Sequence, residues 1–385
     1  MTELFFEVPR NYADPSAGTL RLFGRSVRKH ERPTIPLGLK ELEGMEKLPY
    51  FVYLEGGPGF GNREPQDSSL TRYVLNRGYQ LLFLDYRGTG LSTPISAGHL
   101  MTLGGPQEQA DYLKLFRADN NVRDCEAVRK CLTADFPEDR KKWSIFGQSF
   151  GGFVSLSYLS KHPLGLREVF MTGGLAPIRR TAEEVYRATY KKTIQRNQAY
   201  YRKFPEDAEN VHRVVEYLRT NSVGLPSGGI LTAQRFLSFG VSFGAHGGLD
   251  SIHSLVLKLV ADLDQFGFLT RSSLAATEQH NPFDTNPVYA ILHEPIYCTT
   301  RGAASNWAAA RVGGETEDFL WTQDESHVPK GRPIYFTGEM IFPFHFETYP
   351  ELVDIKEAAH ILSEFDGWDD LYNEAQLRRN DVVSP

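Results

Sequence analysis

The chain has 385 residues, of which 41% are hydrophobic and 23% charged, as is usual for a globular protein. Its formal net charge of −6 gives no electrostatic reason to expect nucleic acid or an anionic membrane as a partner. Its three cysteines are too few for a disulfide framework, and neither an apolar N-terminal segment nor a run of 18 apolar residues indicates secretion or a membrane span. We therefore expect a cytoplasmic protein, without a metal site or a cofactor.

Short apolar runs alternate with helical stretches through the first half of the chain. Residues 4–9 and 19–27 predict two strands, and the second alternates as a half-exposed antiparallel strand does. Four further runs are apolar without alternation: residues 49–54, 80–84, 143–146 and 168–174. A helix is predicted over residues 119–132, where apolar side chains recur at helical spacing. This pattern predicts a parallel sheet that is covered on both faces.

Three loops that contain glycine directly follow three of these strands, at residues 55–61, 85–92 and 147–152. Functional groups gather at the carboxyl ends of parallel strands, so we expect the three loops to share one edge of the sheet. The third loop contains Gly147-Gln148-Ser149-Phe150-Gly151, which has the G-x-S-x-G form of a nucleophile elbow. A tight strand-to-helix turn there lifts the serine hydroxyl clear of the backbone, which makes Ser149 the candidate nucleophile.

The character of the sequence changes after residue 174. Thr181 and Glu184 form a capping-box pattern that opens a helix to about residue 204, and a second helix is predicted over 207–219. Pieces rich in glycine and aromatic residues follow; residues 332–339 look like a strand, and residues 357–364 look helical. We expect an α/β core over residues 1–174, then over 175–385 a mostly helical cap and a segment that leads back towards the core.

A serine nucleophile needs an oxyanion hole to stabilise the tetrahedral intermediate. One donor would be the backbone N–H of Phe150, directly after Ser149. The other would come from Gly56-Gly57, and we assign it to Gly57, because a loop without side chains lets the backbone approach a substrate. A glycine loop alone would fit a plain tight turn; beside Ser149 the oxyanion role is favoured.

The three loops together resemble the signatures of the proline iminopeptidases (prolyl aminopeptidases) of the α/β-hydrolase superfamily. The likeness extends over essentially the whole chain and is closest to the larger fungal and actinobacterial type. Its markers in the second half are residues 243–248, 266–271, 291–298, 305–307 and 335–340. The sequence departs from the usual pattern at Glu55, where the family has His or Gln, and at Tyr86, where it has Gln.

The resemblance implies a serine aminopeptidase that releases an N-terminal residue, preferably proline, from small peptides through an acyl-enzyme. It also implies that acidic cap residues hold the free amino group of the substrate. Glu294 matches the glutamate of the corresponding motif and is the first candidate, with Glu339 as a weaker one. An ordinary salt bridge within the cap is the alternative role for Glu294.

The family's motifs for the catalytic acid and histidine do not occur in this sequence. His345 and His360 lie in contexts that do not match, and His360 belongs to a predicted helix face. We therefore assign no catalytic Asp or His, expect the last core strands to be missing, and expect impaired catalysis, because a serine without a base is a weak nucleophile. An exposed sheet edge would also favour aggregation.

Two other functions stay open on the sequence alone. One is an α/β-hydrolase with another substrate class, such as an esterase or amidase. The other is a non-catalytic fragment or pseudoenzyme that binds peptides. Ser149 disfavours epoxide hydrolases and dehalogenases, because those enzymes carry Asp at the elbow. The sequence does not indicate an oligomeric state.

Overall fold

The structure is a computed structural model and describes residues 1–30, 38, 44 and 47–381. Within these residues, six strands form one mixed sheet in the order β1-β2-β4-β3-β5-β6. The strands are β1 (Thr2–Pro9), β2 (Thr19–Val27), β3 (Tyr50–Leu54), β4 (Gln80–Leu84), β5 (Trp143–Gln148) and β6 (Leu166–Thr172). The last four run parallel, while β1 and β2 pair antiparallel at one end of the sheet. The predicted α/β class is confirmed, as are the six strands predicted within residues 1–174.

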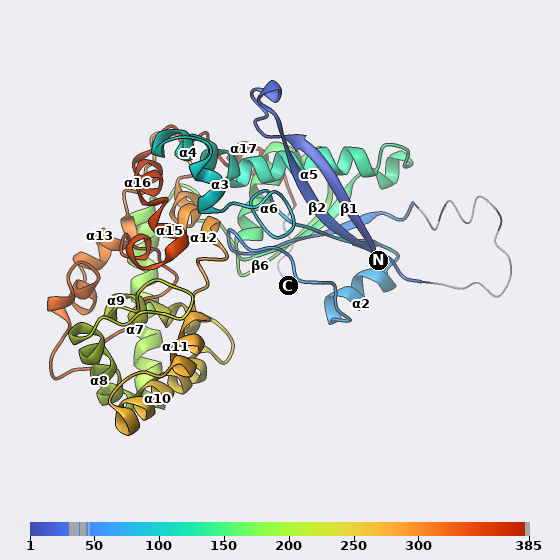
Figure 1. Cartoon of the computed structure of the whole chain (residues 1–385). Coiled ribbons are helices and arrows are strands. Elements are labelled where there is room, and N and C mark those ends of the chain that lie inside the picture. The colour runs from blue at the N-terminus through green and yellow to red at the C-terminus, as the bar shows by residue number, and fades with distance from the viewer. Residues whose placement is uncertain (31–37, 39–43, 45–46, 382–385) are drawn as a thin grey trace.

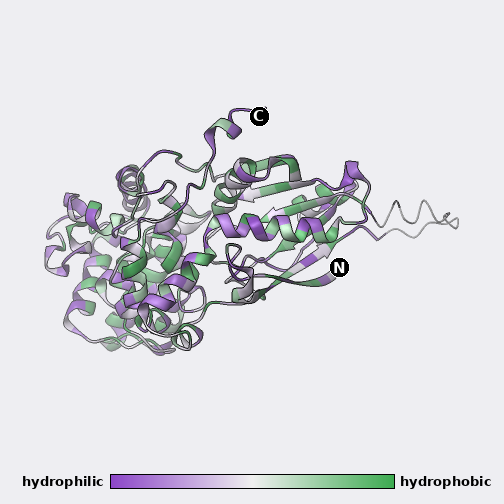
Figure 2. Ribbon diagram, turned by 90° about the horizontal axis from the view of Figure 1, so that it is seen from above, coloured by the Kyte–Doolittle hydropathy of each residue, from purple (hydrophilic) through white to green (hydrophobic). Residues whose placement is uncertain are grey.

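The middle of the sheet is built from residues whose side chains are buried. Val52 on β3 lies beside Leu82 on β4 and Ile145 on β5, and all three side chains are fully buried. Their neighbours Phe51 and Leu81 point to the other face, where they pack against Val74 of helix α2. Figure 2 shows the apolar colouring of these central strands. Burial on both faces explains why these runs do not alternate.

Helices pack on the sheet on the side of Val52. Helix α6 contacts β5, β6 and β3, and helix α5 packs against α6 (Figure 1). The helices described within residues 47–174, on both faces of the sheet, are α2 (Ser69–Asn76), α3 (Ala97–Met101), α4 (Pro106–Leu113), α5 (Ala118–Leu132) and α6 (Phe150–Lys161). Short 3-10 turns accompany them: η1 (Pro15–Ala17), η2 (Lys114–Phe116), η3 (Glu138–Arg140) and η4 (Pro163–Gly165).

A second hydrophobic cluster, which we call the cap cluster, is built from helices beyond residue 181. Helix α7 opens it, and the predicted capping box is present: the Thr181 hydroxyl accepts from the backbone N–H of Glu184, whose carboxylate accepts from that of Thr181. The helical elements of this region are α7 (Ala182–Lys203), α8 (Asp207–Thr220), α9 (Ala233–Leu237), η5 (Ser238–Gly244), α10 (Gly248–Phe266), α11 (Arg271–Glu278), α13 (Ala308–Gly314), η7 (Glu317–Thr322) and η8 (Glu325–His327).

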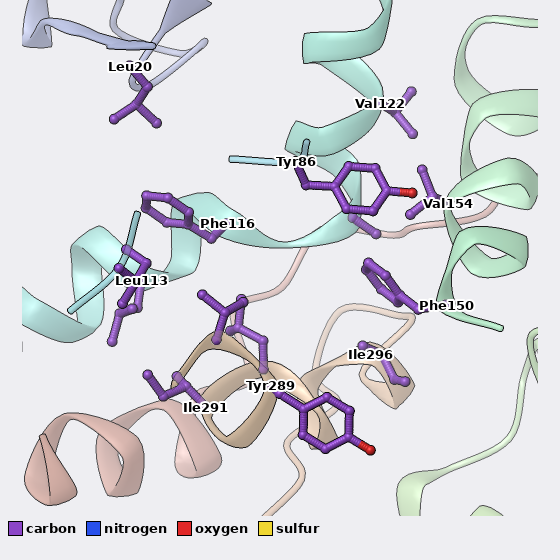
Figure 3. Close-up of a cluster of buried hydrophobic side chains, with 14 of the residues drawn as sticks. Leu20, Tyr86, Leu113, Phe116, Val122, Phe150, Val154, Tyr289, Ile291 and Ile296 are labelled. Atoms are coloured by element: carbon purple, nitrogen blue, oxygen red, sulfur yellow. The ribbon is translucent and has the colours of Figure 1, made fainter. Parts of the chain in front are cut away.

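The remaining elements return to the cluster of the sheet, which we call the core cluster. They are α12 (Pro287–Leu292), η6 (Glu294–Tyr297), α14 (His345–Thr348), α15 (Pro350–Val353), α16 (Lys356–Glu364) and α17 (Glu374–Leu377). Figure 3 shows Ile296 of this group next to Phe150, and Tyr289 and Ile291 elsewhere in the same cluster. Buried Arg117 holds these later residues against the core, because its guanidinium donates to the carbonyls of Cys298 and Asp369 at 3.0 and 2.7 Å. Residues 175–385 therefore divide between two hydrophobic clusters.

The strand predicted over residues 332–339 is wrong. These residues run without a strand partner, although Ile334 and Phe336 are fully buried. The side chain of Asn197 on α7 replaces the missing ladder: its Oδ1 accepts from the N–H of Phe336 and its Nδ2 donates to the carbonyl, both at 2.8 Å. One side-chain amide thus satisfies the buried backbone that a neighbouring strand would otherwise pair.

The sheet ends at β6 in the part of the chain that the structure describes, since β6 pairs there with β5 alone. Most side chains of β6 are exposed or half-buried. Residues 382–385 lie outside the described residues. None of the helices in the described ranges combines the length and apolar content that crossing a membrane requires.

Candidate active site

Ser149 lies on the turn between β5 and α6, as the G-x-S-x-G pattern predicts. Its backbone has φ 54° and ψ −122°, a strained conformation for a residue with a side chain. Two hydrogen bonds hold it: Ser149 N–H donates to the carbonyl of Thr172 at 3.1 Å, and Gly152 N–H donates to the carbonyl of Ser149 at 2.8 Å. The turn therefore ties the serine to the end of β6.

The two glycines of the pattern are required by space. A Cβ on Gly147 would lie 2.2 Å from the carbonyl oxygen of Gly151. A Cβ on Gly151 would lie 2.1 Å from the carbonyl oxygen of Leu54 at the end of β3. Both distances are far below a van der Waals contact, so the first turn of α6 fits against the sheet only with glycine here.

The glycine-rich loop after β3 lies directly against the serine. A Cβ on Gly56 would be 3.3 Å from Ser149 Cβ and 3.8 Å from its Oγ. The Glu55 carboxylate accepts from the N–H of Gly56 at 2.8 Å, so that donor is already used. By contrast, the N–H groups of Gly57 and Phe150 have no protein acceptor among the described residues. These are the two donors that the sequence predicts for an oxyanion hole.

The loop after β4 supports this arrangement from behind. The Asp85 carboxylate accepts from the N–H of Asn62 at 2.7 Å and from that of Leu91 at 2.9 Å. It thereby joins the glycine-rich loop to its own loop. Buried Arg87 makes two bonds to the carboxylate of Asp124, at 2.6 and 2.7 Å. The three loops lie together at one edge of the sheet, as predicted. The loop after β4 holds the glycine-rich loop in place through the hydrogen bonds of Asp85.

A cavity of about 350 Å³ contains Ser149 and Gly57. Its opposite walls come from η5 and the segment after α11, with Glu339 and Met340 beside them. The other lining residues are Phe60, Ser238, Val241, Ser242, Ala245, His280, Asn281, Pro282, Phe283 and Tyr289. The lining is mostly apolar, with a few polar groups, as in sites for small organic ligands.

Glu339 places a carboxylate on the cavity wall. Its Oε1 accepts from the phenol of Tyr289 at 2.9 Å. Burial, and then the nearby Glu339 carboxylate, raise the pKa of Tyr289 well above its usual value, so the phenol stays protonated and donates. The exposed carboxylate is thus oriented and remains free to accept from a ligand.

Glu294 lies outside the residues that line the cavity. Its buried carboxylate accepts from the N–H groups of Ala308 and Ala309, at 3.2 and 2.9 Å, and so caps the start of α13. Burial outweighs these bonds and raises the pKa of Glu294 to about 7. The structure thus brings Glu339, and not Glu294, to the wall of the site.

No histidine or carboxylate makes a hydrogen bond to the Ser149 hydroxyl within residues 1–30, 38, 44 and 47–381. His345 is buried among Phe283, Phe344 and Tyr349, and burial lowers its pKa to about 3. His360 accepts from the indole N–H of Trp307 at 3.0 Å. Neither histidine lines the cavity.

Sequence reasoning missed one histidine of the site. His280 lines the cavity and stacks on Phe239, with ring centroids 5.5 Å apart. Burial lowers the pKa of His280, so its imidazole is neutral near pH 7. The glycine-rich and aromatic composition of residues 236–248 is a sequence feature of one wall of the cavity. It does not indicate that the separate loop with His280 also lines the cavity.

Two known proteins align with this chain over nearly its whole length, and one family model matches part of it. The profile of the alpha/beta hydrolase fold matches residues 49–217. The proline iminopeptidase aneH of Aspergillus aculeatus is 44% identical over 99% of this chain and 81% of its own length. A proline iminopeptidase of Aeromonas sobria is 43% identical over 98% of this chain and 82% of its own.

More distant matches cover less. A proline iminopeptidase of Thermoplasma volcanium is 30% identical over 35% of this chain and 37% of its own. The solved structure of Rv0554 from Mycobacterium tuberculosis is 16% identical and covers 48% of this chain and 50% of its own, with a TM-score of 0.30. The assignment therefore depends on the two long alignments. The chain belongs to the proline iminopeptidase family of proteins with the alpha/beta hydrolase fold.

Proposed function

We propose that this chain is a serine aminopeptidase. Its site binds the N-terminal proline of a small peptide and cleaves the bond after it. The observation that supports this most is the content of one cavity. Ser149, the unpaired N–H of Gly57 and the carboxylate of Glu339 all face the same space of about 350 Å³. A nucleophile, an oxyanion donor and an anchor for an amino group are three parts that the reaction needs, beside a base for the serine proton.

Each part has a defined task. Glu339, held by Tyr289, accepts from the ammonium of the first residue and so fixes the end of the peptide. The carbonyl oxygen of that residue enters between the N–H groups of Gly57 and Phe150. Ser149 Oγ then forms a bond to the carbonyl carbon, the C–N bond to the rest of the peptide breaks, and the serine proton reaches the leaving amine nitrogen through water. A water molecule then cleaves the ester bond of the acyl-enzyme, which releases the free amino acid and returns a proton to Ser149 Oγ.

The relatives support proline as the first residue, since both long alignments are with proteins named proline iminopeptidases. The apolar lining suits a pyrrolidine ring. The proton transfer is the incomplete step, because the described residues offer Ser149 no hydrogen-bonded base. We therefore expect turnover far below that of a complete triad, with binding preserved.

The test separates binding from turnover. The purified chain is titrated with L-prolinamide and with N-acetyl-L-prolinamide, and hydrolysis is followed with prolyl and alanyl anilides and a short-chain ester. We expect L-prolinamide to bind at least tenfold tighter than its acetylated form, and slow hydrolysis with a preference for the prolyl anilide that disappears in Ser149→Ala. A preference for the ester, or equal binding of both amides, would contradict the proposal.

We also propose that the protein works in the cytoplasm. All three cysteines are unpaired, and Cys131 is exposed. An exposed thiol persists most readily in a reducing compartment. Cell fractionation with an antibody against this chain tests the location, and recovery from the culture medium would contradict it.

A further inference from the structure

Three possible metal ligands meet on the surface of the cap cluster, away from the cavity. Glu206 and Asp207 lie at the start of α8, and His253 lies on α10. Each offers one ligand atom, and these three atoms lie within 4.8 Å of one another. None of these residues lines the cavity of Ser149. The group joins two helices that are separate in the sequence.

The centre of the group is a buried carboxylate. Asp207 is fully buried, and its Oδ2 accepts from the phenol of Tyr200 and from Nδ1 of His253, the latter at 2.9 Å. The side chain of Asn210 donates to its other oxygen at 3.3 Å. Within the described residues, the ion-pair partner of Asp207 is His253 alone. Lys203, at the end of α7, pairs with Asp250 at 2.7 Å and not with Asp207.

The imidazole of His253 is held in position for this carboxylate. Its ring is stacked flat on Phe204, with centroids 3.9 Å apart and an angle of 2° between the planes. Stacking fixes the plane of the ring and thereby the direction of Nδ1. Glu206 is exposed and can turn its carboxylate towards the same point. Two ligands are thus placed in advance, and the third completes the set from the solvent side.

We propose that Asp207, His253 and Glu206 form a divalent transition-metal site, with Zn²⁺ as the expected ion. One imidazole nitrogen and two carboxylate oxygens suit zinc, whereas calcium takes six to eight oxygen ligands. Tyr200 and Asn210 would orient the Asp207 carboxylate, as outer partners of metal ligands commonly do. The ion would bridge Asp207 and His253 and fasten α8 to α10.

The experiment uses the full chain, stripped of metal with a chelator. Zn²⁺ is titrated by calorimetry, and Co²⁺ is followed by its visible absorption. We expect one equivalent to bind, with at least a tenfold loss of affinity in His253→Ala and in Glu206→Gln. His246→Ala is the matched control, because His246 is an exposed histidine of the same region outside the group, and it should bind as the unmodified chain does.

A variant outside the ligand set provides an independent readout. Tyr200→Phe removes only the hydrogen bond to Asp207, so the affinity should fall about 10- to 100-fold while the stoichiometry stays at one. Circular dichroism checks that each variant is folded, and Glu206→Gln keeps the test valid should His253→Ala unfold. Absence of stoichiometric binding, or equal affinity in Glu206→Gln and the unmodified chain, would overturn the proposal.

Discussion

Glu339 and Glu294 are two carboxylates of one region with different surroundings. Glu339 faces the cavity and bonds to Tyr289, whereas Glu294 is buried and turned to the N-terminus of α13. Their distance along the chain gives no indication of this difference, which depends on the direction of each side chain. Each therefore has its own expected effect when its charge is removed.

Replacing Glu339 with Gln should weaken the binding of L-prolinamide about tenfold or more. A hydrogen bond to a charged group contributes about 1.5–3 kcal/mol, and the variant keeps the shape of the side chain while losing the charge. Glu294→Gln should leave the affinity within about threefold. Calorimetry on both variants measures this, and a larger loss in Glu294→Gln would return the role to Glu294.

Glu294 should also make stability depend on pH. Its pKa is 4.5 in a free side chain and about 7 in the fold, because burial disfavours the charge. Between these values the unfolded chain releases a proton that the folded chain retains, so stability falls as pH rises from about 4.5 to about 7, by up to about 3 kcal/mol. Above that range the effect is constant.

Urea unfolding at pH 5 and pH 8 tests this in the unmodified chain and in Glu294→Gln. The amide cannot ionise. The difference in stability between the variant and the unmodified chain should therefore favour the variant more at pH 8 than at pH 5. An equal change in both proteins, or a change of opposite sign, would show that the carboxyl ionises normally in the fold.

At the scale of elements, the nucleophile turn is a contact between backbones. The start of α6 lies so close to the ends of β3 and β5 that two glycines fill the space. Gly151→Ala should therefore destabilise the fold by about 1–3 kcal/mol or more, since a methyl group 2.1 Å from the Leu54 carbonyl must displace backbone.

Gly98→Ala is the matched control for this prediction. Gly98 lies within α3, and a Cβ there would meet nothing within 4 Å. Alanine in a helix should stabilise by about 0.5–1 kcal/mol relative to glycine. Thermal unfolding of both variants gives the comparison. Similar effects at the two positions would show that close approach is not what selects glycine at the elbow.

The elements show which features the sequence could predict. The strands β3 to β6 and the helices α5, α7, α8 and α16 follow from local patterns, because their burial repeats along a short stretch. The strand expected at 332–339 fails because Asn197, far away in sequence, satisfies that backbone. The loop that carries His280, and the orientation of Glu294, depend on tertiary packing, which single-sequence patterns do not encode.

At the scale of the whole molecule, the described residues leave one face and one edge of the sheet partly open. On the side of α2, the side chain of Phe170 on β6 stacks on Phe51, with centroids 5.8 Å apart, and remains 45% exposed. Tyr53, Phe83 and Phe146 continue this aromatic surface and are half-buried. An apolar face beside a strand whose outer edge has no partner among the described residues favours self-association.

Phe170→Lys should therefore reduce concentration-dependent self-association of the chain. A charge on this surface opposes pairing between copies, at the cost of the stacking contact with Phe51. Leu257→Lys is the control, because Leu257 is 54% exposed on α10, away from the sheet. Sedimentation velocity over a range of concentrations compares them, and equal behaviour of the two variants would locate association elsewhere.

Trp307 gives the molecule a built-in optical reporter. It packs against both the core cluster and the cap cluster, whereas Trp143 and Trp368 belong to the first and Trp321 to the second. Its indole N–H donates a hydrogen bond to His360 of α16. Any shift of the cap helices against the sheet on ligand binding would change the polarity around this indole, and its emission wavelength with it. The other three tryptophans each lie within a single cluster, so their emission should change less. The spectrum of Trp307→Phe subtracted from that of the unmodified chain would therefore report mainly on Trp307.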